Sequence, residues 1–77
     1  MPFTEGQIVI LHLETPMGGT LAKVESVGIV NRQFAYVAGM RFRQADGHRS
    51  GPGARYIIVA LTTETRPLLR RARPLHL

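Results

Sequence analysis

The sequence predicts a mainly β fold: a small antiparallel barrel, or a strongly bent sheet, of four or five strands with a short C-terminal helix. Three observations predict it. Short runs of β-branched and aromatic residues recur along the chain, turn-forming glycines and prolines separate them, and residues 34–43 alternate strictly between two faces. With 77 residues, the chain has room for one domain, residues 1–77.

The first predicted strand covers residues 7–13, QIVILHL. It is apolar on both faces, because the four residues from Ile8 to Leu11 are all aliphatic. Such a strand lies in the middle of a sheet, or its second face is covered by a helix or another subunit. A turn is expected directly after it at residues 15–19, TPMGG, where Pro16 favours a reversal and the glycines accept positive φ.

The second predicted strand covers residues 20–27. Ala22 and Val24 share one face, whereas Lys23 and Glu25 share the other, which is typical of a strand with one solvated side. Gly28 then predicts a bulge or a sharp bend. Residues 31–33 predict a tight turn into the third strand.

The third predicted strand covers residues 34–43, FAYVAGMRFR, and completes an antiparallel meander. Read as one continuous strand, it places five apolar side chains on the core face: Phe34, Tyr36, Ala38, Met40 and Phe42. The other face carries small residues at the start of the strand and Arg41 and Arg43 at its end, so we expect it to be partly exposed to solvent.

Residues 44–54, QADGHRSGPGA, predict a mobile loop. Residues 54–62 fit either a buried strand or an apolar helix side; their β-branched composition favours the strand, and the alternative is an α+β fold in which residues 54–73 are helical. Thr65 is expected to cap a short helix from Arg66 to about Arg73, which Pro74 ends. Residues 66–77 thus form a basic C-terminal helix or tail.

A chain of this length buries only about 60% of its unfolded surface, so its core needs support. The absence of cysteine excludes disulfides and cysteine-rich zinc sites, which leaves homo-oligomerisation as a dimer or larger species. No apolar run approaches the roughly 20 residues that span a membrane, and the N-terminus lacks a signal-peptide pattern. We expect a cytoplasmic protein without membrane partners.

The net charge of +5 belongs to the second half of the chain. Residues 32–77 hold nine arginines against Asp46 and Glu64, whereas residues 1–31 hold Lys23 against three glutamates. Arginine contacts phosphates or carboxylates through a flat, bidentate fork. The alternative interpretation is that arginine only keeps the surface soluble.

Catalytic and metal sites are not indicated. Ser50 lies near His48 in the sequence. A catalytic serine is usually presented by a sharp turn between a strand and a helix, and a carboxylate orients its histidine; neither feature is present here. His12, His48 and His76 share no ligand spacing, and the carboxylates are not paired for acid–base work. The segment GHRSGPG lacks the lysine of a P-loop. We expect neither an enzyme nor a cofactor.

Two groups of arginines are candidate partner-binding residues. The first flanks the glycine-rich loop and converges at one end of the sheet if the flanking strands pair; it comprises Arg41, Arg43, Arg49 and Arg55. The second lies in the tail and comprises Arg66, Arg70, Arg71 and Arg73. Base stacking needs exposed aromatic rings. The aromatic residues share the predicted core face, and Tyr56 is the only candidate outside that set.

Residues 2–42 resemble the second half of a PilZ-type β-barrel. The resemblance depends on a glycine-led strand at residues 6–13, a strand ending in a valine at residues 20–27, and a strand ending in Gly39-Met40-Arg41-Phe42. PilZ domains bind cyclic di-GMP through RxxxR and DxSxxG motifs that precede this region, and the chain has neither there. The resemblance therefore implies a truncated or ligand-free relative that acts through protein contacts.

The sequence thus predicts a non-catalytic, basic binding or adaptor module that self-associates and contacts an acidic protein or a phosphate-bearing partner. The alternative function is nucleic-acid binding, with the arginine-rich second half following the phosphates. A third is an oligomeric enzyme whose site forms only between subunits.

Overall fold

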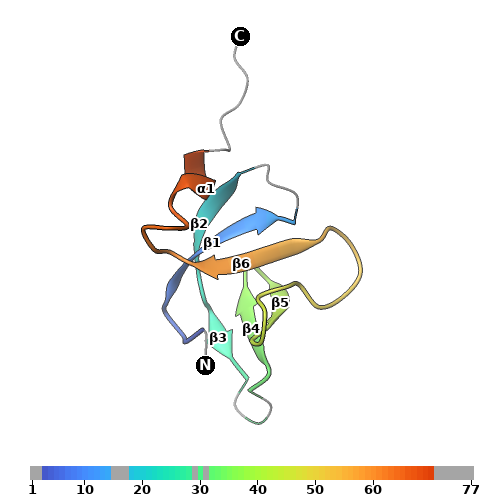
Figure 1. Cartoon of the computed structure of the whole chain (residues 1–77). Helices are drawn as coiled ribbons and strands as arrows, with labels where there is room; N and C mark the ends of the chain where they lie inside the picture. The colour runs from blue at the N-terminus through green and yellow to red at the C-terminus, as the bar shows by residue number, and fades with distance from the viewer. Residues whose placement is uncertain (1–2, 15–17, 29, 31, 71–77) are drawn as a thin grey trace.

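The computed structural model describes residues 3–14, 18–28, 30 and 32–70. These residues form two three-stranded antiparallel sheets and one short helical turn (Figure 1). One sheet has the order β2-β1-β6 and the other the order β3-β4-β5. The elements are β1 (Ile8–Leu13), β2 (Gly19–Lys23), β3 (Ser26–Val27), β4 (Phe34–Val37), β5 (Met40–Arg43), β6 (Tyr56–Ala60) and α1 (Pro67–Arg70).

The mainly β fold class is confirmed, with six strands in the described residues rather than four or five. The strands of this part of the chain do not close into a barrel. Four sequence-based expectations fall on residues outside the described ranges: the turn at Pro16, the turn residue Asn31, the helix end at Pro74, and the tail from residue 71 onward.

The central position of β1 is confirmed, because β1 pairs with β2 on one side and β6 on the other. Val9 faces the main core, and its neighbour Ile10 faces the opposite side of the sheet, yet both are fully buried. On that opposite side α1 contacts β1 and β2 (Figure 1). The doubly apolar sequence of β1 thus matches a strand that is covered on both faces at Val9 and Ile10.

The core lies where the two sheets meet. Its buried members come from both sheets and from the N-terminal stretch: Phe3, Val9, Val24, Ala35, Val37, Phe42 and Ile58. Phe42 is the largest fully buried side chain, and it enters the core from β5. The one buried polar side chain among the described residues is Gln44, directly after β5.

The prediction of one continuous strand over residues 34–43 is wrong. Ala38 and Gly39 both have positive φ, 53° and 76°, and they form a two-residue turn between β4 and β5. Two positive φ values are the signature of a type I′ hairpin turn, whose twist matches that of the paired strands. Glu25 supports the turn, since its carboxylate accepts a hydrogen bond of 3.1 Å from the Ala38 backbone N–H.

This turn changes which residues face the core. Val37 lies opposite Met40, and Ala35 lies opposite Phe42, so the inward side chains are odd-numbered before the turn and even-numbered after it. Ala35 and Val37 are fully buried, whereas Phe34 and Tyr36 are only partly buried. Of the five predicted core residues, Phe42 is buried, and Ala38 is exposed in the turn.

The second predicted strand is divided at Val24 and Glu25. The backbone N–H of Val24 donates to Gln7 O at 2.9 Å, and that of Glu25 donates to Tyr36 O at 2.8 Å. The chain thus leaves the first sheet and joins the second within one residue. The bend predicted at Gly28 occurs earlier, and the face assignment is confirmed because Val24 is buried while Lys23 and Glu25 are exposed.

Residues 47–50, expected in a mobile loop, are hydrogen-bonded on both sides. Phe42 pairs with Arg49, and His48 pairs with Ile57, so this short segment lies between β5 and β6. Gly47 makes the arrangement possible: its φ is 76°, and a Cβ added there would collide with the carbonyl oxygen of Ile58. The Gly47 carbonyl also accepts a hydrogen bond of 2.9 Å from Ile58 N–H.

The C-terminal part shows that residues 56–60 form a strand, so the alternative of a helix over residues 54–73 is wrong. The helix begins at Pro67, which suits its first position because proline has no N–H to donate. Thr65 does not cap it with its side chain; its hydroxyl donates to Ala60 O at 2.7 Å, and its carbonyl accepts from Leu68 N–H. Within the described residues, no helix has the length and apolar character required to cross a membrane.

Candidate anion-binding site

Three of the four predicted loop-flanking arginines line one polar pocket of about 360 Å³. Arg43 ends β5, Arg49 lies in the segment between β5 and β6, and Arg55 directly precedes β6. The prediction assumed that the two flanking strands, β5 and β6, pair with each other. They do not pair directly, because the segment that carries Arg49 lies between them. We call this the arginine pocket, and its other walls are Glu14, His48, residues 51–54 and Tyr56.

Each guanidinium in the arginine pocket has one intramolecular partner. Arg43 donates two hydrogen bonds to the Asp46 carboxylate, from Nε at 3.2 Å and from Nη2 at 2.7 Å. Arg55 Nη1 donates to Glu14 at 3.3 Å, and both of these pairs are substantially exposed. Exposed ion pairs contribute little net free energy, so a stronger anionic partner is able to displace them.

Arg49 differs from the other two. Its Nη1 donates to the Ala54 carbonyl at 3.2 Å, but its Nε is buried and has no hydrogen-bond partner among the described residues. Gly53 leaves room for this guanidinium, because a Cβ there would lie 2.7 Å from Arg49 Nη1. A buried N–H without an acceptor costs about 1–3 kcal/mol.

The charge balance of the arginine pocket is positive. The pocket is lined by three arginines and one carboxylate residue, Glu14. Asp46 does not line the pocket, but its ion pair with Arg43 neutralises part of the positive charge of that arginine. The hydrogen bonds from Arg43 and from the His48 backbone N–H hold the pKa of Asp46 well below its usual range, so this carboxyl stays ionised. The same pair raises the pKa of Arg43 above its ordinary value.

Arg41, the fourth predicted residue, does not line the pocket. Its Nη2 donates to Ser50 Oγ at 3.3 Å, and its guanidinium carbon lies 4.5 Å from the centre of the Phe34 ring. It therefore lies on the outer face of the β4–β5 hairpin. The sequence analysis missed the aromatic members of this face because it assigned Phe34 and Tyr36 to the core; the signal that identifies them is Ala38-Gly39 read as a hairpin turn.

Of the four predicted tail arginines, the structure describes the side chain of Arg66 alone. Arg66 is exposed in the turn before α1 and lines none of the described pockets. Arg70 is the last residue of α1, and Arg71 and Arg73 lie outside the described residues. Their predicted role stays a prediction.

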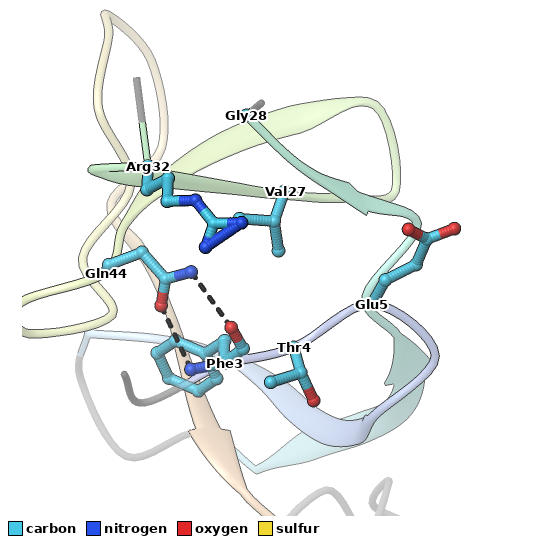
Figure 2. A pocket seen from close by; sticks show the side chains of 7 residues that line it. All are labelled: Phe3, Thr4, Glu5, Val27, Gly28, Arg32 and Gln44. Carbon is cyan, nitrogen blue, oxygen red and sulfur yellow. Dashed lines mark hydrogen bonds between the residues drawn. The ribbon is translucent and has the colours of Figure 1, made fainter. Parts of the chain in front are cut away.

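A second pocket, of about 280 Å³, lies between the N-terminal stretch and β3 (Figure 2). Phe3 and Val27 line it from opposite sides, and the Arg32 side chain extends between Gln44 and Val27 (Figure 2). Gln44 closes one side: its Oε1 accepts from Phe3 N–H at 3.0 Å, and its Nε2 donates to Phe3 O at 2.9 Å. This reciprocal pair fastens the N-terminal stretch to the end of β5 and explains why an amide is tolerated in the core.

Ser50 and His48 are not hydrogen-bonded to each other. The Ser50 hydroxyl contacts Arg41, and Nδ1 of His48 faces Asp46, with 3.4 Å between Nδ1 and Oδ1. Within the described ranges, no group of three or more histidines and carboxylates is arranged to hold a metal ion.

Comparison with protein-family models, with curated proteins and with solved structures found no match for this chain. The resemblance to PilZ domains stays a prediction from the strand pattern.

Proposed function

We propose that the protein is a non-catalytic binding module whose arginine pocket receives an anionic group of a partner. The single observation that carries the proposal is that Arg43, Arg49 and Arg55 line one polar pocket, whereas the pocket has one lining carboxylate, Glu14. Three guanidiniums around one concavity fit a phosphate or a carboxylate, because each presents N–H donors in a planar fork.

The scaffold suits such a role. The two bridges Phe42–Arg49 and His48–Ile57 link the two sheets, and they support a single strongly bent, barrel-like unit. Arg49 is thus carried by a segment that is hydrogen-bonded on both sides rather than by a free loop. A donor held in place before binding loses less conformational entropy when the anion arrives.

The test is calorimetric titration of the protein with inorganic pyrophosphate at low salt. Arg49→Gln should weaken binding about ten- to a hundredfold, as expected for the loss of charge-assisted hydrogen bonds. Lys23→Gln is the matched control, because it removes the same charge from an exposed residue of β2 outside the pocket. If both substitutions weakened binding equally, the affinity for pyrophosphate would depend only on the net charge of the protein, and the proposal would fail.

Self-association remains part of the proposed function. It is supported by the small core expected of a 77-residue chain without cysteine and by the exposed apolar residues Ile8 and Leu21.

A further inference from the structure

The outer face of the β4–β5 hairpin carries two aromatic rings and two arginines. In the register of the hairpin, Phe34 lies opposite Arg43, and Tyr36 lies opposite Arg41. Side chains directly opposite each other in an antiparallel pair point to the same side of the sheet, so these four share one face. Both arginines are exposed and both rings are partly exposed. We call this set the stacking face.

Arg41 extends the aromatic surface. Its guanidinium carbon lies 4.5 Å from the Phe34 ring centre, and its Nη2 is hydrogen-bonded to Ser50, which holds the planar group over the ring. A guanidinium that covers a ring on one side offers its other side as a second flat surface. Nucleobases stack on arginine planes as well as on aromatic rings.

The stacking face adjoins the arginine pocket through Arg43. This residue lines the pocket, and it is also the cross-strand neighbour of Phe34. A flat platform for stacking thus lies directly beside a site for an anionic group. A nucleotide combines these two features, since its base is a planar π system and its phosphate is an anion.

We infer that the partner of this module is a single-stranded nucleic acid, with a base on the Phe34–Arg41 platform and a phosphate in the arginine pocket. The inference rests on the proposed function, because it assigns the anionic group to a phosphate of the strand. Unpaired bases are required, since the bases of a duplex hide their faces from a protein surface. An acidic peptide would use the arginines but gains nothing from the rings.

The experiment measures fluorescence anisotropy with labelled eight-nucleotide oligomers at low salt: oligouridine, oligothymidine, and an abasic strand of equal charge. An oligoglutamate peptide of similar charge serves as the alternative partner. The strands that carry bases should bind at least about tenfold more tightly than the abasic strand, because stacking contributes strongly for each base. A difference between oligouridine and oligothymidine identifies RNA or DNA as the preferred source of the strand.

Two variants locate the contact. Phe34→Leu and Arg41→Gln should each remove most of the preference for bases while leaving pyrophosphate binding unchanged, because neither residue lines the arginine pocket. Arg41→Gln tests the platform even if the loss of the Phe34 ring affects folding, and Lys23→Gln controls for its charge. Arg49→Gln should weaken both the oligomers and pyrophosphate.

The outcomes separate the two proposals. Equal affinity for the abasic strand and the base-carrying strands overturns the inference and leaves the anion pocket standing. Tighter binding of oligoglutamate also overturns it, and makes an acidic protein the partner. Failure of pyrophosphate and of all the strands to bind would overturn the proposed function together with the inference.

Discussion

The exposed carboxylate of Asp46 holds two neighbouring groups beside the arginine pocket, the guanidinium of Arg43 and the backbone of His48. It accepts two hydrogen bonds from Arg43 and one of 3.0 Å from the His48 backbone N–H, at the start of the segment that carries Arg49. These bonds hold its pKa below the usual range. They are stronger when the carboxyl is ionised, so they couple the local structure to pH.

The predicted pH dependence follows from this depressed pKa. A carboxyl whose folded-state pKa lies below its unfolded value stabilises the fold at pH values above about 4, and this contribution is lost as the pH falls further. Thermal unfolding should therefore show Asp46→Asn to be less stable than the parent at pH 7, with the difference shrinking toward pH 2 and at high salt.

The matched control for this measurement is Glu64→Gln. Glu64 is exposed and makes no ion pair in the described part of the chain. A difference between the parent and Asp46→Asn that stays constant from pH 7 to pH 2 would contradict the role assigned to the ionised carboxylate.

At the scale of an element, the β4–β5 hairpin depends on two residues with positive φ. Ala38 adopts φ 53°, a conformation that costs an ordinary L-residue about 1–2 kcal/mol. Asn-Gly is the preferred pair in this turn type, so Ala38→Asn should stabilise the protein by about 1 kcal/mol. The change is measurable by chemical denaturation.

Gly39→Ala is the converse substitution. A Cβ at Gly39 meets no atom within 4 Å, so the expected loss of about 1 kcal/mol arises from the backbone conformation alone. Ala45→Asn is the control for the asparagine, because Ala45 is exposed in a turn without positive φ. A stabilisation by Ala45→Asn equal to that of Ala38→Asn would show that the turn geometry is not its cause.

The same hairpin explains where prediction from the sequence failed. The strict alternation of residues 34–43 is compatible with one long strand, and it hides a two-residue turn because Ala38 is not a typical turn residue. A turn of two residues reverses the chain and changes the parity of the inward positions. One unrecognised turn therefore moved Phe34 and Tyr36 from the predicted core to the outer face.

At the scale of the whole molecule, the outer face of the β2-β1-β6 sheet carries an exposed apolar pair. Ile8 is 43% exposed and Leu21 is 57% exposed, and the two are diagonal neighbours in the β1–β2 register. The sequence predicts self-association for a chain of this size. Light scattering should give a mass of at least twice the 8.5 kDa of one chain, with little change between low and high salt.

Leu21→Lys should shift this mass toward that of the single chain, because it places a charge among the apolar groups. Val30→Lys is the matched control: Val30 is 98% exposed outside the sheets, and the charge change is the same. A parent protein that scatters as a single chain at every concentration would contradict the prediction of self-association and leave the arginine pocket as the main lead.

By itself, the sequence determined the local and compositional properties of this protein. The mainly β class follows from β-branched runs between glycine and proline turns, and the central place of β1 follows from apolar residues on both of its faces. The arginines of the second half were recognisable as candidates for the same reason: their charge and donor geometry belong to the residue type and need no fold.

Only the tertiary structure decided which arginines lie together and which aromatic rings face outward. Arg49 joins Arg43 and Arg55 because a short segment pairs with β5 on one side and β6 on the other, and no local pattern encodes those partners. Phe34 comes to lie beside Arg41 because the Ala38-Gly39 turn sets the register of the hairpin. Cross-strand pairing joins residues distant in sequence, so it is settled only when the whole core packs.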